Sequence, residues 1–185
     1  MRVVGGQFRG RALAAPQSAA TRPTSDRVRE AVFNILAHGI DDFSLDGAKV
    51  LDLFAGTGAL GIEALSRGAS FCMFVEEEAS ARGTIRENVE ALGLTGVTKI
   101  FRRDVTGLGE AGKYAGFSVL FADPPYDKGL AEKALASAVS GGWLVANAIA
   151  VIEARAGATI DLPPAFHHLD TRIWGDTQVV FARFG

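Results

Sequence analysis

Residues 49–61 read Lys49-Val50-Leu51-Asp52-Leu53-Phe54-Ala55-Gly56-Thr57-Gly58-Ala59-Leu60-Gly61. The apolar run from Val50 to Phe54, interrupted only by Asp52, predicts a buried strand, and the three glycines behind it predict a tight turn into a helix. At such a turn the helix N-terminus exposes backbone N–H groups, and glycine lets a ligand approach them closely. An acidic residue, Glu76, follows about 20 residues after the first glycine, as in nucleotide-binding folds. We therefore expect a nucleotide-like cofactor at this turn.

Apolar runs alternate with helical patterns along most of the chain after this turn. The runs predict strands at residues 50–54, 71–76, 98–102, 118–123 and 148–153, and the helical patterns fall at 59–67, 79–92 and 130–139. Helices that alternate with largely apolar strands imply a parallel sheet covered on both faces. Two further strands, 167–174 and 178–183, flank the turn Gly175-Asp176 and predict an antiparallel hairpin. The expected fold is a doubly wound, Rossmann-like α/β domain spanning residues 24–185.

Residues 1–23 are expected to form a separate extension of this domain. Residues 2–4 and 12–14 flank a loop rich in glycine and arginine, which predicts a small β-hairpin. Residues 15–23 contain two prolines and several small residues, and they predict a loop. Thr24 or Ser25 then caps a helix that ends near His38-Gly39.

The charge of the chain is unevenly distributed. Its 185 residues are 48% hydrophobic and 22% charged, which fits one globular domain with a sizeable core, and the net charge is −2. The first 30 residues hold six arginines against two acidic residues, a local balance of +4 that leaves about −6 for the remainder. Because the planar guanidinium pairs well with phosphate, this segment indicates a polyanionic substrate, with an ordinary solvated surface as the alternative.

Several features point to a cytoplasmic protein without a metal. No apolar run approaches the roughly 20 residues of a membrane span, and no signal-peptide core follows the N-terminus. The single cysteine, Cys72, lies in an apolar run and is interpreted as a buried thiol. The three histidines have no cysteine or carboxylate at metal-ligand spacing. Two further acidic residues, Glu63 and Glu153, are interpreted as a helix-surface and a strand-end residue.

Carboxylates follow several of the predicted strands at the edge where a doubly wound sheet binds ligands. Such a row suits S-adenosylmethionine, which carries a sulfonium and an ammonium group and no phosphate, better than a dinucleotide. Glu76 is expected to accept hydrogen bonds from the ribose hydroxyls and Asp104 to contact adenine; a structural cap is the alternative for Asp52 and Asp104. The predicted cofactor-binding residues are Asp52, Phe54, Ala55, Gly56, Thr57, Gly58, Glu76, Asp104 and Asp123.

The sequence Asp123-Pro124-Pro125-Tyr126 closes the predicted strand at 118–123 and is the most specific motif in the chain. Two consecutive prolines fix the backbone and remove two N–H donors, so carbonyl oxygens project at the strand end. Asp123 and the carbonyl of Pro124 can both accept from one exocyclic amino group, while the ring of Tyr126 stacks on the base. This arrangement would aim the nitrogen lone pair at the sulfonium methyl group, so Asp123, Pro124 and Tyr126 are predicted to be catalytic.

The glycine turn and the Asp-Pro-Pro-Tyr motif together resemble class I S-adenosylmethionine-dependent methyltransferases that act on an exocyclic amino nitrogen. Val3-Val4-Gly5-Gly6, Arg9-Gly10-Arg11 and residues 22–30 narrow this to the bacterial family that methylates guanine N2 in small-subunit (16S) ribosomal RNA. The resemblance covers nearly the whole chain and implies a seven-stranded sheet whose last strand is antiparallel and inserted. It also implies that the substrate is the ribosomal small subunit or an assembly intermediate, and that four arginines hold the RNA: Arg9, Arg11, Arg22 and Arg27.

Three alternatives remain at the level of the sequence. An enzyme that methylates adenine N6 in DNA would use the same amine geometry, but 185 residues leave little room for a region that reads and flips a DNA base. An RNA-binding or assembly factor without catalysis would have no need of both amine acceptors and the stacking ring. A nicotinamide dehydrogenase is disfavoured because the Asp-Pro-Pro-Tyr strand end has no role in hydride transfer.

Overall fold

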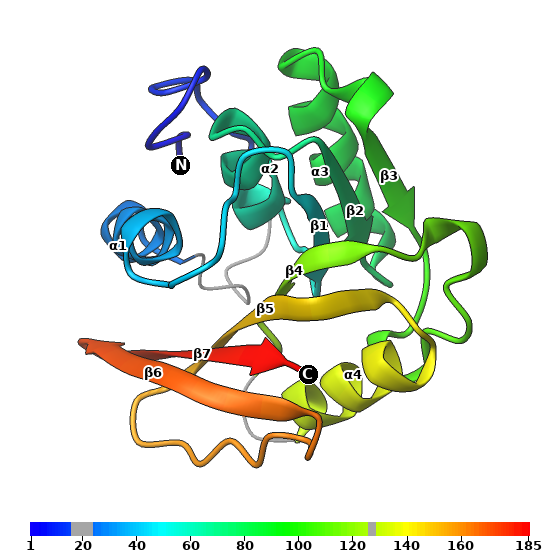
Figure 1. Ribbon diagram of the computed structural model, residues 1–185. Helices are drawn as coiled ribbons and strands as arrows, with labels where there is room; N and C mark the ends of the chain where they lie inside the picture. The colour runs from blue at the N-terminus through cyan, green and yellow to red at the C-terminus, as the bar shows by residue number, and fades with distance from the viewer. Residues whose placement is uncertain (16–23, 126–128) are drawn as a thin grey trace.

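The computed structural model describes residues 1–15, 24–125 and 129–185, and a seven-stranded sheet runs through its centre (Figure 1). The strand order is β3-β2-β1-β4-β5-β7-β6. The first five strands pair in parallel, whereas β7 pairs antiparallel with both β5 and β6 and so is the inserted strand. The predicted fold class is therefore confirmed. The strands are β1 (Lys49–Leu53), β2 (Phe71–Val75), β3 (Thr98–Phe101), β4 (Phe117–Ala122), β5 (Leu144–Arg155), β6 (Phe166–Trp174) and β7 (Thr177–Phe184).

Helices cover both faces of the sheet. The α-helices are α1 (Asp26–His38), α2 (Ala59–Ser66), α3 (Ala79–Ala91) and α4 (Leu130–Ser140), and three 3-10 turns lie at η1 (Thr95–Val97), η2 (Val105–Gly107) and η3 (Gly112–Tyr114). The first three α-helices pack on one face and α4 on the other (Figure 1). Strand residues alternate between two buried clusters, with Val50 facing α1–α3 and Leu51 facing α4. This two-sided burial explains the nearly continuous apolar runs of the central strands.

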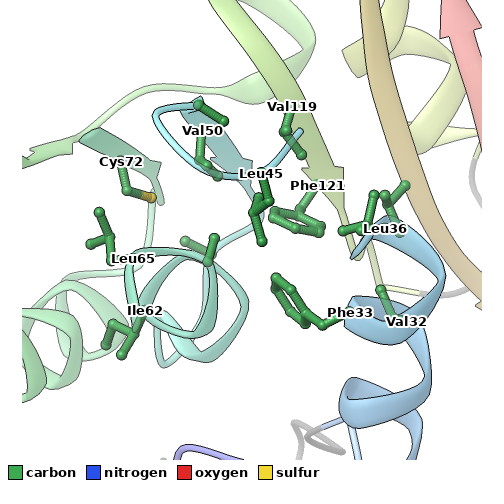
Figure 2. Packing of buried hydrophobic residues seen from close by; sticks show 14 of the residues in the cluster. Val32, Phe33, Leu36, Leu45, Val50, Ile62, Leu65, Cys72, Val119 and Phe121 are labelled. Atoms are coloured by element: carbon green, nitrogen blue, oxygen red, sulfur yellow. The ribbon is translucent and has the colours of Figure 1, made fainter. Parts of the chain in front are cut away.

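The first helix closes the core from the N-terminal side. Ser25 caps it, accepting a hydrogen bond from the backbone N–H of Val28 at 3.2 Å, which satisfies a donor at the start of the helix. The ring of Phe33 on α1 lies 5.6 Å from that of Phe121 on β4. Figure 2 shows the side chains of Phe33 and Phe121 pointing toward each other. The predicted helix is thus confirmed and is part of the main core.

Strand β5 is longer than the predicted strand at 148–153 and begins at Leu144. Its pairing with β4 is irregular, because Phe117 pairs with Leu144 while Val119 pairs with Ile149. The extra residues form a bulge in which Asn147 has φ of 64°, and residues 145–147 are exposed. The polar residue Asn147 interrupts the apolar run at this bulge, which explains the late predicted start.

The N-terminal segment folds back on itself as expected, with less strand structure than a full hairpin. Arg2 and Ala12 form one antiparallel bridge, and the N–H of Val3 donates to the carbonyl of Arg11 at 2.9 Å. Val3 and Leu13 are buried in the cluster formed by α1–α3. Within the described ranges, no helix has the length and apolar character to cross a membrane, and no three His, Cys, Asp or Glu side chains are grouped so that they could hold a metal ion.

Candidate active site

The turn after β1 has the strand–turn–helix geometry predicted from its glycines. Gly56 and Gly58 have φ of 58° and 79°, and Gly58 is the N-cap of α2. Phe54 also has a positive φ, 54°, although it is not glycine. A non-glycine residue in this region costs roughly 1–3 kcal/mol, and such residues cluster at functional sites. The backbone of the turn is therefore held in a shape that the strand alone would not adopt.

Asp52 lies beneath this turn rather than on its surface. Its side chain is 2% exposed, and its Oδ2 accepts a hydrogen bond of 3.0 Å from the backbone N–H of Gly61. Burial raises the pKa of Asp52 to about 8, against the opposing effect of the Gly61 hydrogen bond. In the described structure Asp52 thus supports the helix start from inside, and its predicted contact with the cofactor stays a prediction.

Gly61 is required by its surroundings. A Cβ at this position would lie 2.5 Å from the Sγ of Cys72, 2.5 Å from Cε1 of Phe74 and 3.0 Å from Oδ2 of Asp52. Because side-chain carbons are not found this close, α2 can approach β2 only with glycine here. The third glycine of the motif therefore brings the helix N-terminus against the sheet.

Glu76 follows β2 and is hydrogen-bonded to the same turn. Its Oε2 accepts from the N–H of Gly56 at 2.9 Å, and its Oε1 accepts from the N–H of Glu78 at 3.0 Å. Glu76 is half-buried, whereas Glu77 and Glu78 are exposed. Each carboxylate oxygen has more than one acceptor direction, so Glu76 can still receive hydroxyl donors. The structure brings Glu76 together with the glycine turn, as its predicted role requires.

Asp104 follows β3 and caps the 3-10 turn η2. Its Oδ1 accepts from both the N–H (2.8 Å) and the hydroxyl (2.7 Å) of Thr106. These two bonds lower the pKa of Asp104. Asp104 is exposed and both bonds use the same oxygen, Oδ1. Its predicted contact with adenine stays a prediction.

Asp123 comes directly after β4, beside the glycine turn. Leu53 at the end of β1 pairs with Ala122 at the end of β4, so Phe54 and Asp123 continue from neighbouring strand ends. Burial first, and then the charges of Glu153 and Asp52, raise the pKa of Asp123 well above its ordinary value. Pro124 is half-buried, and Tyr126 lies outside the described residues.

Glu153, which is absent from the predicted site residues, lies on the strand next to that of Asp123 and acts on the Asp123 carboxyl group. Ala122 on β4 pairs with Ile152 on β5. Asp123 directly follows Ala122 and Glu153 directly follows Ile152, so the two acidic residues occupy equivalent positions. Glu153 is 8% exposed, and its Oε2 accepts a hydrogen bond of 2.5 Å from the hydroxyl of Thr24. Its place at the end of an apolar run was the same signal that identified Asp123, and it could have been applied here.

The predicted RNA-binding arginines are only partly described. Arg9, Arg11 and Arg27 are exposed, and Nη2 of Arg11 donates to the carbonyl of Ala91 at 3.2 Å. Arg22 lies outside the described residues. The exposed positive charge of the N-terminal segment is smaller than the sequence count, because Arg29 is fully buried.

The prediction that Glu63 lies on the helix surface is wrong. Its side chain is fully buried, and its oxygens accept from the backbone N–H groups of Val4 (3.0 Å) and Gly5 (2.8 Å). Nε of Arg67 donates to Oε1 at 2.8 Å, and Nε of Arg29 lies 3.6 Å from Oε2. A buried carboxylate needs such partners, and here they come from the N-terminal segment, α1 and the end of α2.

Comparison with known proteins gives a consistent result. The model of the family described as "Conserved hypothetical protein 95" matches residues 1–183. The chain is 36% identical over 165 residues to Ribosomal RNA small subunit methyltransferase D of Escherichia coli K12, covering 89% of this chain and 80% of that protein. It is 34% identical over 155 residues to the protein of the same name from Haemophilus influenzae, covering 83% and 78%.

Solved structures show the same likeness over nearly the full length. The structure of Escherichia coli yhhF superposes with a TM-score of 0.83 at 29% identity, covering 100% of this chain and 97% of that chain. The structure of Haemophilus influenzae HI0767 superposes with a TM-score of 0.79 at 26% identity, covering 99% and 97%. The N-terminal segment is therefore included in the structural match.

Proposed function

The chain belongs to the ribosomal RNA small subunit methyltransferase D family, and from this premise we propose that it transfers a methyl group from S-adenosylmethionine to the exocyclic N2 amine of a guanine in 16S ribosomal RNA. The observation that carries this proposal is the position of Asp123 beside the glycine turn. Their strands, β4 and β1, are hydrogen-bonded neighbours whose ends lie at one edge of the sheet. An amine held at Asp123 would thus lie next to a methyl donor held at the turn.

S-adenosylmethionine is the cofactor that suits the turn best. The backbone N–H of Gly56 and the carboxylate of Glu76 are joined at 2.9 Å, so the acidic residue is fixed where a ribose would lie against the glycines. The turn supplies its own acceptor at the start of α2, because Oδ2 of the buried Asp52 accepts the N–H of Gly61. A cofactor with a sulfonium and an ammonium group fits this acidic edge.

The methyl transfer depends more on the orientation of the amine than on general acid–base catalysis. The nitrogen lone pair forms the new C–N bond while the methyl–sulfur bond breaks and its electron pair stays on sulfur. An exocyclic aromatic amine is a weak nucleophile, and the protein supplies proximity and hydrogen-bond acceptors that turn its lone pair towards the methyl group. Asp123 and the carbonyl of Pro124 are those acceptors in the proposal, and Tyr126 is the stacking ring.

The RNA would be held by Arg9, Arg11, Arg22 and Arg27, in the ribosomal small subunit or an assembly intermediate. Arg9, Arg11 and Arg27 are exposed on the N-terminal loop and the first turn of α1. This segment is anchored to α2 through the hydrogen bonds that Glu63 accepts from Val4 and Gly5. A fixed loop presents its arginines to phosphates at a lower entropic cost than a free one.

The experiment that tests the function uses labelled S-adenosylmethionine with three substrates: naked 16S ribosomal RNA, small subunits from cells lacking the enzyme, and duplex DNA. N2-methylguanine in the digested RNA is the expected product. Methyladenine in DNA, or cofactor binding without transfer to any substrate, would overturn the assignment.

Asp123→Ala tests the site in the same assay. Transfer should fall at least about 100-fold, because the amine loses an acceptor, while binding of S-adenosylhomocysteine measured by calorimetry changes little. Asp161→Ala, in the exposed loop before β6, is the matched control and should keep full activity. Full activity of Asp123→Ala would refute the role given to this residue.

A further inference from the structure

Two acidic residues occupy equivalent positions on neighbouring strands of the candidate site. Asp123 follows Ala122 at the end of β4, and Glu153 follows Ile152, its paired residue on β5. In parallel strands, residues at paired positions point to the same side of the sheet. The two carboxyl groups therefore lie side by side at the edge where the amine is proposed to bind.

The surroundings of this pair contain acids, neutral groups and, on α1, the guanidinium of Arg29, whose Nη1 donates to the carbonyl of Thr24 at 3.5 Å. On the other side of Glu153, β7 contributes Val179, while the Gln178 side chain is bonded to Gly157 and Ala158 in the loop after β5. From β1, Asp52 adds a further carboxyl group that acts on Asp123. The ion pairs found between described residues include neither Asp123 nor Glu153; Arg155, two positions beyond Glu153 on the same strand, is exposed and has interactions of its own.

Two neighbouring carboxyl groups in a poorly solvated place do not both ionise readily, so the second of the two protons is released less easily than the first. Burial raises the pKa of both, and the charge of Glu153 raises that of Asp123 further. The Thr24 hydroxyl, 2.5 Å from Oε2, opposes the rise at Glu153 by stabilising its charged form. This asymmetry favours ionisation of Glu153 before that of Asp123.

We propose that Glu153, held by the hydroxyl of Thr24, is a positioning residue for the methyl transfer and the final acceptor of the amine's proton, which reaches it through Asp123. The inference rests on the proposed function. One oxygen of Asp123 accepts an N–H of the amine, and its O–H points to Glu153. When the C–N bond forms and the C–S bond breaks, the nitrogen gives one proton to Asp123, which passes its own to Glu153. The sulfonium becomes a neutral thioether, the amine stays neutral and the carboxyl pair goes from −1 to neutral, so charge balances.

Three variants test this proposal through the dependence of kcat on pH at saturating substrates. In Glu153→Gln only Asp123 is left to ionise, so kcat should fall about 10- to 100-fold. The acid limb, which is the fall of kcat at low pH, should move to higher pH, because Asp123 ionises less readily than Glu153. Thr24→Val removes the hydrogen bond that stabilises the charged form of Glu153, so the acid limb of this variant should move up by about 0.5–1 pH unit. Thr24→Ser, which keeps the hydroxyl, should match the wild type. Acid limbs of Glu153→Gln and Thr24→Val that coincide with the wild type would overturn the proposal.

A second readout does not depend on methyl transfer. Carbon NMR of the labelled Asp123 carboxyl group follows its titration in the wild type and in Glu153→Gln. Removal of the neighbouring charge should lower the pKa of Asp123, while an unchanged value would show that the two groups do not share a proton and would overturn the inference. If the wild type methylates no substrate, the proposed function fails in the transfer assay, and this titration still decides whether the pair is coupled.

Discussion

The guanidinium of Arg29 on α1 and the carboxylate of Glu63 on α2 form a buried ion pair, with Nε and Oε2 3.6 Å apart and neither residue exposed to solvent. Nη2 of Arg29 also donates to Asp26 at 2.8 Å and to the carbonyl of Arg2. Glu63 in turn accepts two backbone N–H groups of the N-terminal segment. These bonds join the N-terminal segment, α1 and α2, three parts that are far apart in the sequence.

Glu63→Ala should therefore lower the free energy of unfolding by about 3–5 kcal/mol, because it leaves the buried charge of Arg29 without one of its partners and two backbone N–H groups without acceptors. Urea denaturation followed by circular dichroism measures the loss. Glu87→Ala, an exposed position on α3, is the control and should change the value by less than about 0.5 kcal/mol. A loss at Glu63 no larger than at Glu87 would show that the pair is not needed for stability.

This pair also shows where reasoning from the sequence stopped. The strands, helices and C-terminal hairpin followed from local apolar patterns, and the resemblance to the small-subunit ribosomal RNA methyltransferase family is confirmed by the family match. Glu63 was misplaced because its backbone partner Val4 lies 59 residues away, and no local pattern in α2 reveals a partner at that distance. A glutamate inside a helix is by default a surface residue.

The candidate site was easier to predict than the buried ion pair. Carboxyl ends of parallel strands meet at one edge of a sheet, so Glu76 and Asp123 could be placed together as soon as their strands were recognised. The same reasoning could have placed Glu153 at this edge, but its pairing with Asp123 and its bond to Thr24 depend on the order of β4 and β5 and on the position of α1, which are tertiary facts. The position of Asp52 beneath the turn likewise depended on the close approach of α2.

That close approach predicts opposite effects for two glycine substitutions. Gly61→Ala should destabilise the protein by about 1–3 kcal/mol, since its Cβ would lie 2.5 Å from Cys72 and from Phe74, and it should weaken S-adenosylhomocysteine binding by displacing the N-terminus of α2. Gly83→Ala, inside α3 with nothing within 4 Å of the added carbon, should stabilise the protein by up to about 1 kcal/mol. Thermal unfolding measures both, and equal effects of the same sign would contradict the packing described here.

Asp52 predicts a particular dependence of stability on pH. Its pKa is about 8 in the folded protein, against an ordinary aspartate pKa of 3.8, so between these pH values the folded state keeps a proton that the unfolded chain releases. The free energy of unfolding should therefore fall as pH rises from 5 to 8. Asp52→Asn should reduce the slope of this fall by up to about 1.4 kcal/mol per pH unit. A smaller slope should remain in the variant, because Asp123 and Glu153 also have raised pKa values.

Urea denaturation at constant ionic strength, at half-unit steps from pH 5 to 8.5, measures both slopes. Asparagine keeps an oxygen that can accept the N–H of Gly61, so the variant should fold like the wild type. Identical slopes for the two proteins would show that Asp52 is ionised across this range.

The exposed arginines of the N-terminal segment predict how RNA binding responds to salt. Arg9→Ala and Arg27→Ala should each weaken binding of 16S ribosomal RNA and reduce the slope of log Kobs against log salt concentration by about 1, because each removes one phosphate contact and the counterion it releases. Arg172→Ala is the control, since Arg172 on β6 is exposed but is bonded to Asp170 at 2.8 Å. Its slope should equal that of the wild type. If all three variants keep the wild-type slope, the RNA binds another surface. If the slope falls only in Arg9→Ala and Arg27→Ala, the phosphate contacts belong to the N-terminal segment that Glu63 anchors.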